Sequence, residues 1–242
     1  MNTIKIRVYK STENIQACLR FSEGHGDVLK SYNIKKVTSA NTAWYHDPGV
    51  YLIMIESQSG NEVYGGARFH LKNKNTLLPV EEAIGKIDSR IFKLTGSQSN
   101  IKTGEMCGMW NKKNMTGNGL SVLLMRVGIA KCTIFIAEKH KIDTVFAFCA
   151  PWTVKMCQNI GFTIENSVGN NGQFFYPTPE LIASVYSIKD IETLKKATKS
   201  DRKGIFDLRE NPVQKRKENG PKGQITVEYD LMMNHEIPAL AI

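Results

Sequence analysis

The most informative segment of the chain is GEMCGMWNKKNMTGNGLSVLLMRVGIAKCTIFIAEKH, which spans residues 104–140. Residues 104–111 form a short apolar run that contains glycines, as is typical of a buried strand. Residues 112–119 are rich in turn-forming residues. Residues 120–140 place leucine, valine and isoleucine side chains at helical spacing. The segment therefore predicts a strand, a glycine-containing turn and a long helix.

The alternation of strand and helix continues beyond this helix. DTVFAFC (143–149) is aromatic and β-branched, which predicts a second buried strand. PWTVKMCQNI (151–160) predicts another helix, because proline is tolerated in a first helical turn. Gly161 ends that helix, and Phe162 follows it directly. The expected order over residues 104–162 is thus strand, turn, helix, strand, helix.

The turn Thr116-Gly117-Asn118-Gly119 precedes the long helix. Glycines allow a backbone to approach a ligand closely, because no Cβ atom stands in the way. The helix that follows offers N–H groups without helical partners and the positive end of its dipole. Together these features suit an anion such as a pyrophosphate. A plain turn with a helix cap produces the same pattern, so both interpretations stay open.

This order of elements resembles the GNAT superfamily of acyl-CoA-dependent N-acyltransferases over residues ~45–165. That family carries Arg/Gln-x-x-Gly-x-Gly/Ala at the turn, whereas residues 114–119 read Asn-Met-Thr-Gly-Asn-Gly, so Asn114 departs from the pattern. Cys157 is a second departure, because it stands where the family usually has a tyrosine that protonates the leaving thiolate. The resemblance implies an α+β fold, with a mixed, mostly antiparallel central sheet flanked by helices on both faces. It also implies that an acyl donor is bound by Met109, Trp110, Asn111, Asn114, Thr116, Gly117, Asn118, Gly119 and Leu120.

A second resemblance, to the acyl-homoserine-lactone synthases, rests on three positions. These are Asp47 before one strand, Arg68 in GGARFH and Glu105 in the strand before the turn. Gly108 and Met109 stand where those enzymes have an arginine and a phenylalanine, so N-acylation of a small amine or amino acid is expected in place of lactone synthesis. This resemblance implies that the acceptor contacts Asp47 and Arg68. The GNAT-like arrangement places Trp44 over the acceptor pocket, and packing of its loop onto the core is the alternative. Arg68 is expected to pair with Asp47 or Glu105, or to hold a substrate carboxylate; a surface ion pair is the alternative.

Acyl transfer requires a base, a polarised carbonyl and a protonated leaving thiolate. Glu105 is the candidate base, because burial raises the pKa of a carboxyl group toward neutrality; a solvated carboxylate at a strand edge is the alternative. The N–H groups of residues 109–111 are candidates for polarising the carbonyl. Cys157 is a candidate proton donor, since an ordinary thiol has a pKa of about 8.5, although a cysteine on an apolar helix face more often packs in the core.

Composition limits the class of protein. The chain has 242 residues, of which 41% are hydrophobic and 23% charged, as in ordinary globular proteins. Five scattered cysteines without a Cys-x-x-Cys pair predict neither a disulfide framework nor a metal site, and they favour a cytoplasmic protein. We expect no secretory signal and no membrane span. The net charge of +9 is explained by solubility or by an acidic partner, such as acyl carrier protein. Nucleic-acid binding through residues 211–223 is unlikely, because no aromatic residues are interleaved with the basic ones.

The remaining segments predict one GNAT-like domain over residues 1–242, with a helical and basic insertion at about 189–222. Ser11 is expected to cap a helix that Gly24-His25-Gly26 breaks or loosens. The strongest strand signals lie in a hairpin formed by 49–57 and 61–71. Other predicted elements are a strand at 3–9, a loop at 32–48, a short helix after Pro79, a strand interrupted by prolines at 172–188, a helix at 190–200, a flexible connection at 211–223 and a strand at 223–233.

Taken together, the residues predict a cytosolic N-acyltransferase. It would move an acyl group from acyl-CoA or acyl carrier protein to the amine of a small molecule or amino acid, by direct attack and without a metal. The alternative is a GNAT-like module that binds acyl-CoA or regulates a partner but has lost catalysis, because Cys157 and Asn114 replace residues that the family uses.

Overall fold

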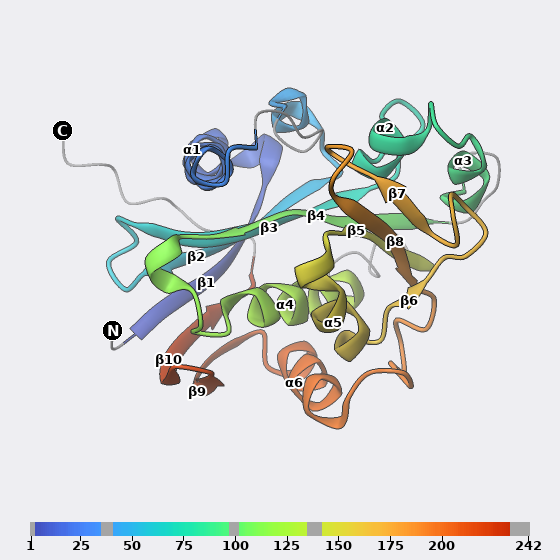
Figure 1. Cartoon of the computed structure of the whole chain (residues 1–242). Helices are drawn as coiled ribbons and strands as arrows, with labels where there is room; N and C mark the ends of the chain where they lie inside the picture. Colours follow the sequence, from blue (N-terminus) through green and yellow to red (C-terminus); the bar gives the residue numbers. More distant parts are fainter. Residues whose placement is uncertain (1–2, 35–40, 97–101, 135–141, 233–242) are drawn as a thin grey trace.

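A single large sheet forms the centre of the protein, and helices cover both of its faces (Figure 1). The computed structural model describes residues 3–34, 41–96, 102–134 and 142–232. The strands follow the order β6-β8-β5-β4-β3-β2-β1-β10-β9, and β7 pairs with β8. Neighbouring strands are antiparallel except for β4 with β5 and β1 with β10, which are parallel. The predicted mixed, mostly antiparallel α+β fold is therefore confirmed.

The bounds of the strands agree with the main hydrophobic patterns of the sequence. The predicted hairpin at 49–57 and 61–71 is present as β2 and β3, and the informative apolar runs at 104–111 and 143–149 are β4 and β5. The strands are β1 (Thr3–Lys10), β2 (Val50–Ser57), β3 (Val63–Leu71), β4 (Thr103–Asn111), β5 (Thr144–Cys149), β6 (Thr163–Ile164), β7 (Gln173–Phe175), β8 (Ile182–Ile188), β9 (Val213–Gly220) and β10 (Gly223–Asp230).

The helices divide between the two faces of the sheet. In Figure 1, α1, α2 and α3 lie above the sheet, and α4, α5 and α6 lie below it. Gly161 ends α5 as predicted, with the left-handed φ of 110° that favours glycine. The helices are α1 (Ile15–Ser31), α2 (Pro79–Ile84), α3 (Arg90–Leu94), α4 (Leu120–Ile134), α5 (Pro151–Ile160) and α6 (Lys199–Glu210), with 3-10 turns η1 (Ser11–Glu13), η3 (Ala43–His46) and η4 (Lys113–Met115).

The two faces of the central strands differ in chemistry. Side chains alternate along a strand, so consecutive residues enter different layers. On the side of α4, residues such as Ile53, Phe69 and Met106 belong to an apolar core. On the side of α1, Leu52 packs with aromatic side chains, but Arg68 is also fully buried. Polar chemistry inside the protein is thus concentrated on the α1 side of these strands.

Two glycines let α1 lie directly on the sheet. A Cβ atom built on Gly66 of β3 would lie 2.8 Å from Phe21 Cε2, and one built on Gly24 of α1 would lie 2.0 Å from Trp110 Cη2. Both distances are shorter than van der Waals contact. These positions fix the height of α1 above β3 and β4, and with it the depth of the space between helix and sheet.

The beginning of α1 corrects two expectations. Asn14 caps the helix by accepting a hydrogen bond from the Ala17 N–H at 2.8 Å, whereas Ser11 Oγ donates to the backbone carbonyl of Asp47 at 2.7 Å. The helix also continues through Gly24 and Gly26 without a break. Tertiary contacts of the helix outweigh the weak helix propensity of glycine here.

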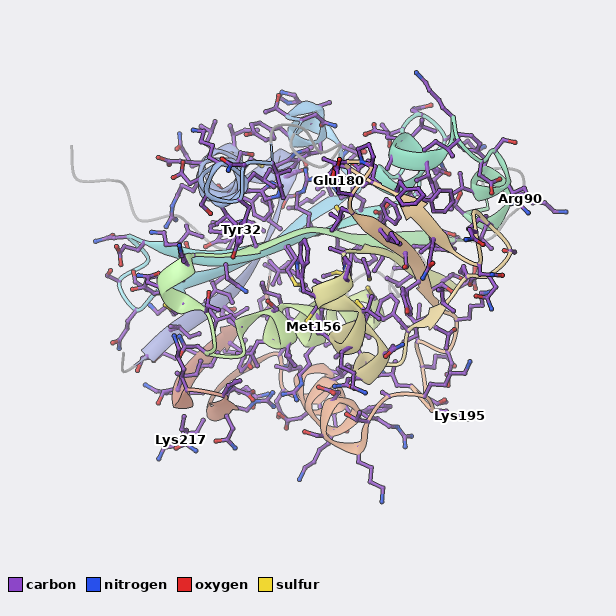
Figure 2. All side chains as sticks on the ribbon, viewed as in Figure 1. Tyr32, Arg90, Met156, Glu180, Lys195 and Lys217 are labelled. Atoms are coloured by element: carbon purple, nitrogen blue, oxygen red, sulfur yellow. The ribbon has the colours of Figure 1, made fainter. Side chains whose placement is uncertain are left out.

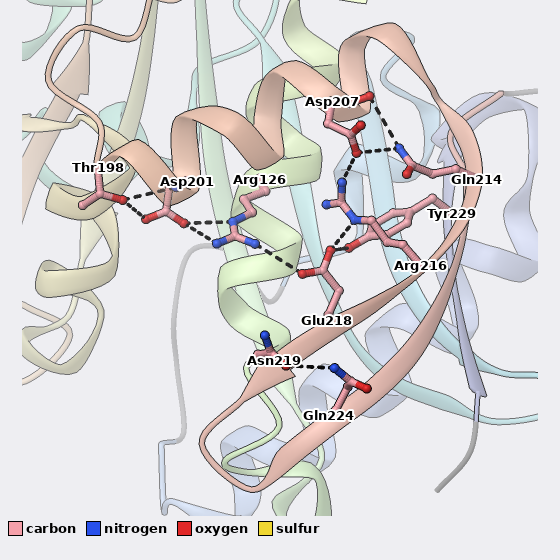
Figure 3. A network of polar contacts seen from close by, with 10 residues as sticks. All are labelled: Arg126, Thr198, Asp201, Asp207, Gln214, Arg216, Glu218, Asn219, Gln224 and Tyr229. Atoms are coloured by element: carbon pink, nitrogen blue, oxygen red, sulfur yellow. Dashed lines mark hydrogen bonds and ion pairs between the residues drawn. The ribbon is translucent and has the colours of Figure 1, made fainter.

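The C-terminal third contains further corrections. The predicted helix at 190–200 is wrong, because the helix α6 occupies Lys199–Glu210. The predicted flexible connection at 211–223 is wrong as well, because β9 pairs with β10 over Val213–Gly220. Hydropathy gave no sign of β9, since its inward-facing residues are charged. Figure 3 shows how they are neutralised: Arg216 Nε donates to Glu218 at 2.6 Å, and Tyr229 Oη donates to the same oxygen at 2.7 Å.

Two predictions extend beyond what the structure describes. The helix predicted at 120–140 is present as α4 to Ile134, and its continuation lies outside the described residues. Within the predicted loop at 32–48, residues 35–40 lie outside them too. The rest of that loop contains the short turn η3, which carries Trp44 and Tyr45 into the core.

Candidate active site

The parallel strands β4 and β5 separate partway along their length. They are paired from Thr103 with Thr144 to Met106 with Ala147. Beyond Met106, β4 continues beside β3, whereas the end of β5 pairs with β8. The two strands therefore diverge, and the sheet opens between them.

A bulge in β4 lies where the strands diverge. Arg68 of β3 faces Cys107, and Gly66 faces Trp110, so Ala67 alone lies opposite both Gly108 and Met109. Gly108 has a φ of 56°, and a Cβ atom there would lie 3.1 Å from Arg68 Nε. The positive φ and the nearby guanidinium of Arg68 both favour glycine at this position. Of the residues predicted to polarise the carbonyl, Met109 is in the bulge, whereas Trp110 and Asn111 are in register with β3.

A cavity of about 220 Å³ passes through this opening. Glu105 and Cys107 line it from the face of β4 that α1 covers, and Met156 of α5 lines it from the opposite side (Figure 2). The lining is mostly apolar, with few ionisable groups. The residues that line it are His25, Leu29, Ile34, Pro79, Glu105, Met106, Cys107, Gly108, Met109, Met125, Ala147, Phe148, Cys149, Ala150, Trp152, Thr153, Met156, Cys157, Tyr176, Pro177, Leu181 and Ala183.

Glu105 is the acidic side chain of this cavity. It is 1% exposed, and one carboxylate oxygen accepts the Val80 N–H at 2.9 Å. Burial raises the pKa of Glu105 to about 8, although the Val80 N–H and the charge of Arg68 oppose the shift. The carboxyl group therefore gains and loses its proton near neutral pH, as a general base requires. The alternative of a solvated carboxylate at a strand edge is wrong.

The first turn of α2 holds Val80 in place beside Glu105. Pro79 starts this helix. The carboxylate of Glu81 accepts the Leu78 N–H at 2.7 Å and also binds Lys72 and Thr95. The sequence signal of a proline followed by acidic residues predicted this short helix, but its contact with Glu105 arises from the tertiary fold.

Arg68 places a positive charge beside the cavity. It is 0% exposed, and its guanidinium carbon lies 4.4 Å from the ring centre of Trp44 and 5.7 Å from that of Phe21. Its charge favours the ionised form of Glu105 and disfavours the protonated form of His25. The surface ion pair considered for Arg68 is therefore wrong, and the arginine acts electrostatically from within the core.

Asp47 has a different set of partners from those expected. Its carboxylate accepts the Gly49 N–H at 2.8 Å and the Thr76 hydroxyl at 2.8 Å, and it also binds the amide of Asn73. These contacts connect the start of β2 to the loop after β3. Among the described residues that line the cavity, Trp44, Asp47 and Arg68 do not appear. Their assignment to the acceptor stays a prediction.

The glycine turn lies at the start of α4, in contact with the β9–β10 hairpin. Gly117 and Gly119 have positive φ values of 88° and 76°. The Lys222 N–H donates to the Gly117 carbonyl at 3.0 Å, and the Lys222 side chain lies against the α-carbon of Gly117. Asn114 and Thr116, which precede the two glycines, are exposed. The hairpin thus covers the glycines, whereas the start of the turn is exposed.

The other residues predicted to bind the donor have mixed environments. Met109 lines the cavity. Trp110 is buried under α1, and Leu120 is buried in the apolar core, so their side chains contribute to packing. Asn111 donates to the Ser121 hydroxyl at 2.6 Å, and Asn118 donates to the Met115 carbonyl at 3.0 Å. These bonds shape the turn. Binding of a donor by this segment stays a prediction.

Cys157 lies beside Cys149 in the cavity wall. The two Sγ atoms are 3.1 Å apart, and both side chains are buried. All five cysteines are free thiols. The position of Cys157 is compatible both with donation of a proton into the cavity and with core packing, so its catalytic role stays a prediction.

His25 is the site residue that sequence reasoning missed. It lines the cavity from α1 and is 6% exposed. Because Gly24 and Gly26 suggested a broken helix, the helical spacing of Phe21, His25 and Leu29 was not considered. Residues four apart lie on the same helical face. That spacing was the available signal.

Comparisons with known proteins place this fold. The sequence matches no protein-family model and no curated protein. In the part of the chain that the structure describes, no helix combines the length and hydropathy that crossing a membrane would need.

Solved structures do match. FeeM, an N-acyl amino acid synthase from uncultured soil microbes, aligns with a TM-score of 0.57 and 12% identity, over 82% of this chain and 97% of its own. BjaI, a CoA-dependent acyl-homoserine lactone synthase, aligns with a TM-score of 0.55 and 11% identity, over 95% of each chain. Escherichia coli ElaA aligns with a TM-score of 0.52 and 10% identity, over 76% of this chain and 98% of its own. This chain therefore has the fold of the GNAT acyltransferases.

Proposed function

We propose that this protein is an N-acyltransferase that moves an acyl group from a thioester to the amine of a small molecule. The observation that carries the proposal is the cavity between β4 and β5, which reaches both faces of the sheet at the bulge of Gly108. A thioester from one face and an amine from the other would meet beside Glu105. The similarity of the fold to FeeM, an N-acyl amino acid synthase, and to BjaI, a CoA-dependent acyl-homoserine lactone synthase, supports this reaction class.

The side of the cavity near α5 suits the acyl donor. Met106, Met109, Met125, Trp152 and Met156 line it. Methionine side chains adapt to an irregular hydrocarbon surface. The phosphates of CoA would lie at the exposed start of the glycine turn, near the first N–H groups of α4 and the positive end of the helix dipole, which favour an anion. The preferred donor is therefore a thioester of a hydrocarbon acyl chain.

The reaction proceeds by direct attack. The amine nitrogen forms a bond to the thioester carbonyl carbon, while the N–H of Met109 stabilises the negative charge on the oxygen. Glu105 accepts the proton that the nitrogen loses. The carbon–sulfur bond then breaks, and the departing thiolate takes a proton from Cys157. The products are an amide and a free thiol, and the proton on Glu105 restores the thiol of Cys157 through solvent.

Release of thiol tests the proposal. The purified protein is incubated with acyl-CoAs of increasing chain length and with a panel of amines, amino acids included, and free thiol is measured. We expect turnover that requires both substrates and increases with chain length beyond acetyl. The same acyl groups are also offered on acyl carrier protein, so that the two donor types can be compared. The net charge of +9 is the reason to include this acidic donor. Donor binding without thiol release from any pair would contradict the enzymatic function and indicate an inactive binding module.

A further inference from the structure

His25 faces the same cavity as Glu105 but comes from a different element. Glu105 is on β4, in the floor of the cavity, and His25 is on α1, which covers that face of the sheet. Leu29, one helical turn after His25, lines the cavity as well. On this side of the sheet, an acceptor molecule would therefore lie between the imidazole and the carboxyl group.

The position of His25 is fixed by its neighbours. Gly24 lies directly against the ring of Trp110. Phe21, one turn before His25, packs edge-on against Trp110 with ring centres 5.9 Å apart, and its ring centre lies 5.9 Å from that of His25. These contacts fix this part of α1 on the sheet and place the ring of Phe21 beside the imidazole without a substrate. The side chain is thus preorganised and not part of a freely moving segment.

The charge state of His25 suits an amine. Burial and the nearby charge of Arg68 lower the pKa of His25 to about 4, so the imidazole is neutral at neutral pH. A neutral imidazole has one nitrogen that accepts a hydrogen bond. The same positive charge of Arg68 disfavours a bound ammonium and favours the neutral amine, which is the nucleophilic form. His25 can therefore accept an N–H of the amine and leave the nitrogen lone pair available.

We propose that His25 binds the acceptor amine, and that the acceptor is a primary amine with an apolar body. The imidazole accepts one N–H of the amine, and Glu105 receives the proton released during attack. Leu29, Phe148 and Leu181 line the cavity around them and would contact the apolar body. This inference rests on the proposed function, and it adds to it a binding residue and a class of acceptor.

Two variants test the role of His25. His25→Leu removes the acceptor nitrogen but keeps a side chain of similar size, and His25→Gln restores a group that accepts hydrogen bonds. With phenethylamine and octanoyl-CoA, we expect the amine KM to rise about 10-fold in His25→Leu, as loss of a hydrogen bond predicts, and to recover in His25→Gln. The KM of octanoyl-CoA should stay unchanged in both. Equal amine KM values in the two variants and the natural protein would overturn the proposal.

A binding measurement separates this inference from the enzymatic function. Phenethylamine is titrated into the protein with isotope-labelled histidine, and the imidazole signals are followed by NMR; His25→Gln identifies the signal of His25, and the exposed His46 is the control. We expect the His25 signal to shift at saturation and that of His46 to stay. A shift without thiol release supports the amine site while the proposed function fails. Thiol release without a shift refutes the role of His25 alone. The NMR result also decides the matter if His25→Leu does not fold.

Discussion

Two groups of charged side chains lie inside this protein, and they differ in how completely they are neutralised. In the first group, between α4, α6 and the β9–β10 hairpin, Arg126 binds Asp201 at 2.8 Å and Glu218 at 3.4 Å, and Arg216 binds Glu218 and Asp207 (Figure 3). Every charge there faces an opposite charge. Such a network connects α4, α6 and the β9–β10 hairpin through ion pairs.

The second group lies on the opposite face of the sheet. Glu105 accepts a backbone N–H and borders a cavity, and its pKa is raised to about 8 because burial outweighs the attraction of Arg68. Burial and the positive charge of Arg68 both lower the pKa of His25, to about 4. Buried ionisable groups with strongly shifted pKa values, next to a cavity, are typical of functional sites. The comparison teaches that a shifted pKa beside a cavity, and not burial itself, marks the candidate site.

The largest expected effect in this comparison comes from Glu105→Gln. It removes the base but keeps the size of the side chain, so kcat should fall by about 10²–10⁴-fold while the acyl-CoA KM changes little. Steady-state thiol release measures both. An unchanged kcat would exclude Glu105 as the base.

The same variant should also change how the unfolding free energy depends on pH, and this dependence runs opposite to that of kcat. In the natural protein, the folded state retains a proton on Glu105 up to about pH 8, whereas an unfolded glutamate releases it near 4.5. Stability should therefore decrease as the pH rises between these values, while kcat increases. Glu105→Gln should abolish this part of the pH dependence of the unfolding free energy. Denaturant unfolding over that pH range measures it, and an identical slope in both proteins would contradict the raised pKa.

The next effect concerns the fully paired group. Arg126→Ala removes the cation that binds the buried Asp201 and one of the two cations that bind Glu218, so the unfolding free energy should fall by about 2–4 kcal/mol. Lys203→Ala, on the exposed side of α6, is the control and should cost almost nothing. Thermal or denaturant unfolding measures the difference. In contrast to Glu105→Gln, neither variant should move the pH at which kcat is half-maximal.

Cys157→Ser should have a smaller effect on catalysis. A serine hydroxyl is a far weaker acid than a thiol, so kcat should fall about 10-fold if Cys157 protonates the departing thiolate. Cys132→Ser makes the same change in the same apolar core, away from the cavity, and should lower stability without changing kcat. Equal kcat values for both variants would assign Cys157 to packing alone.

The smallest effect is a shift in the pH profile. Arg68→Met removes the charge that favours ionised Glu105, so the pH of half-maximal kcat should move upward. Arg68→Lys keeps a positive charge and should move it less. The pH dependence of kcat measures both. A downward shift in Arg68→Met would show that Arg68 does not act through its charge on Glu105.

Local patterns predicted the elements around the site but not how the elements meet. The glycines of the turn, the apolar runs of β4 and β5, and Pro151 with Gly161 at the ends of α5 each carry a short-range signal, and the structure confirms those elements. Glu105 was identifiable as a carboxylate within an apolar strand. His25 was not, because the glycines beside it weaken the local preference for helix, and only the contact of Gly24 with Trp110 explains one of them.

The charged strand β9 illustrates the same limit. Its sequence lacks hydrophobic alternation, and its inward-facing Arg216 and Glu218 are stable only because Arg126, Asp207 and Tyr229 come to them from other elements. Prediction from hydropathy therefore fails where pairing between distant segments replaces burial of apolar surface.

The sequence by itself determined the order of strands, turn and helices from residue 103 to residue 162 and the presence of a carboxylate in the central strand, because periodicity, glycine and proline act over a few residues. The tertiary structure alone decided where β4 and β5 separate, that α1 carries His25 over Glu105, and how Arg68 influences both. The separation of the two strands, the burial of Glu105 and His25 and the electric field of Arg68 all depend on groups that are distant along the chain. No local sequence pattern therefore encodes them.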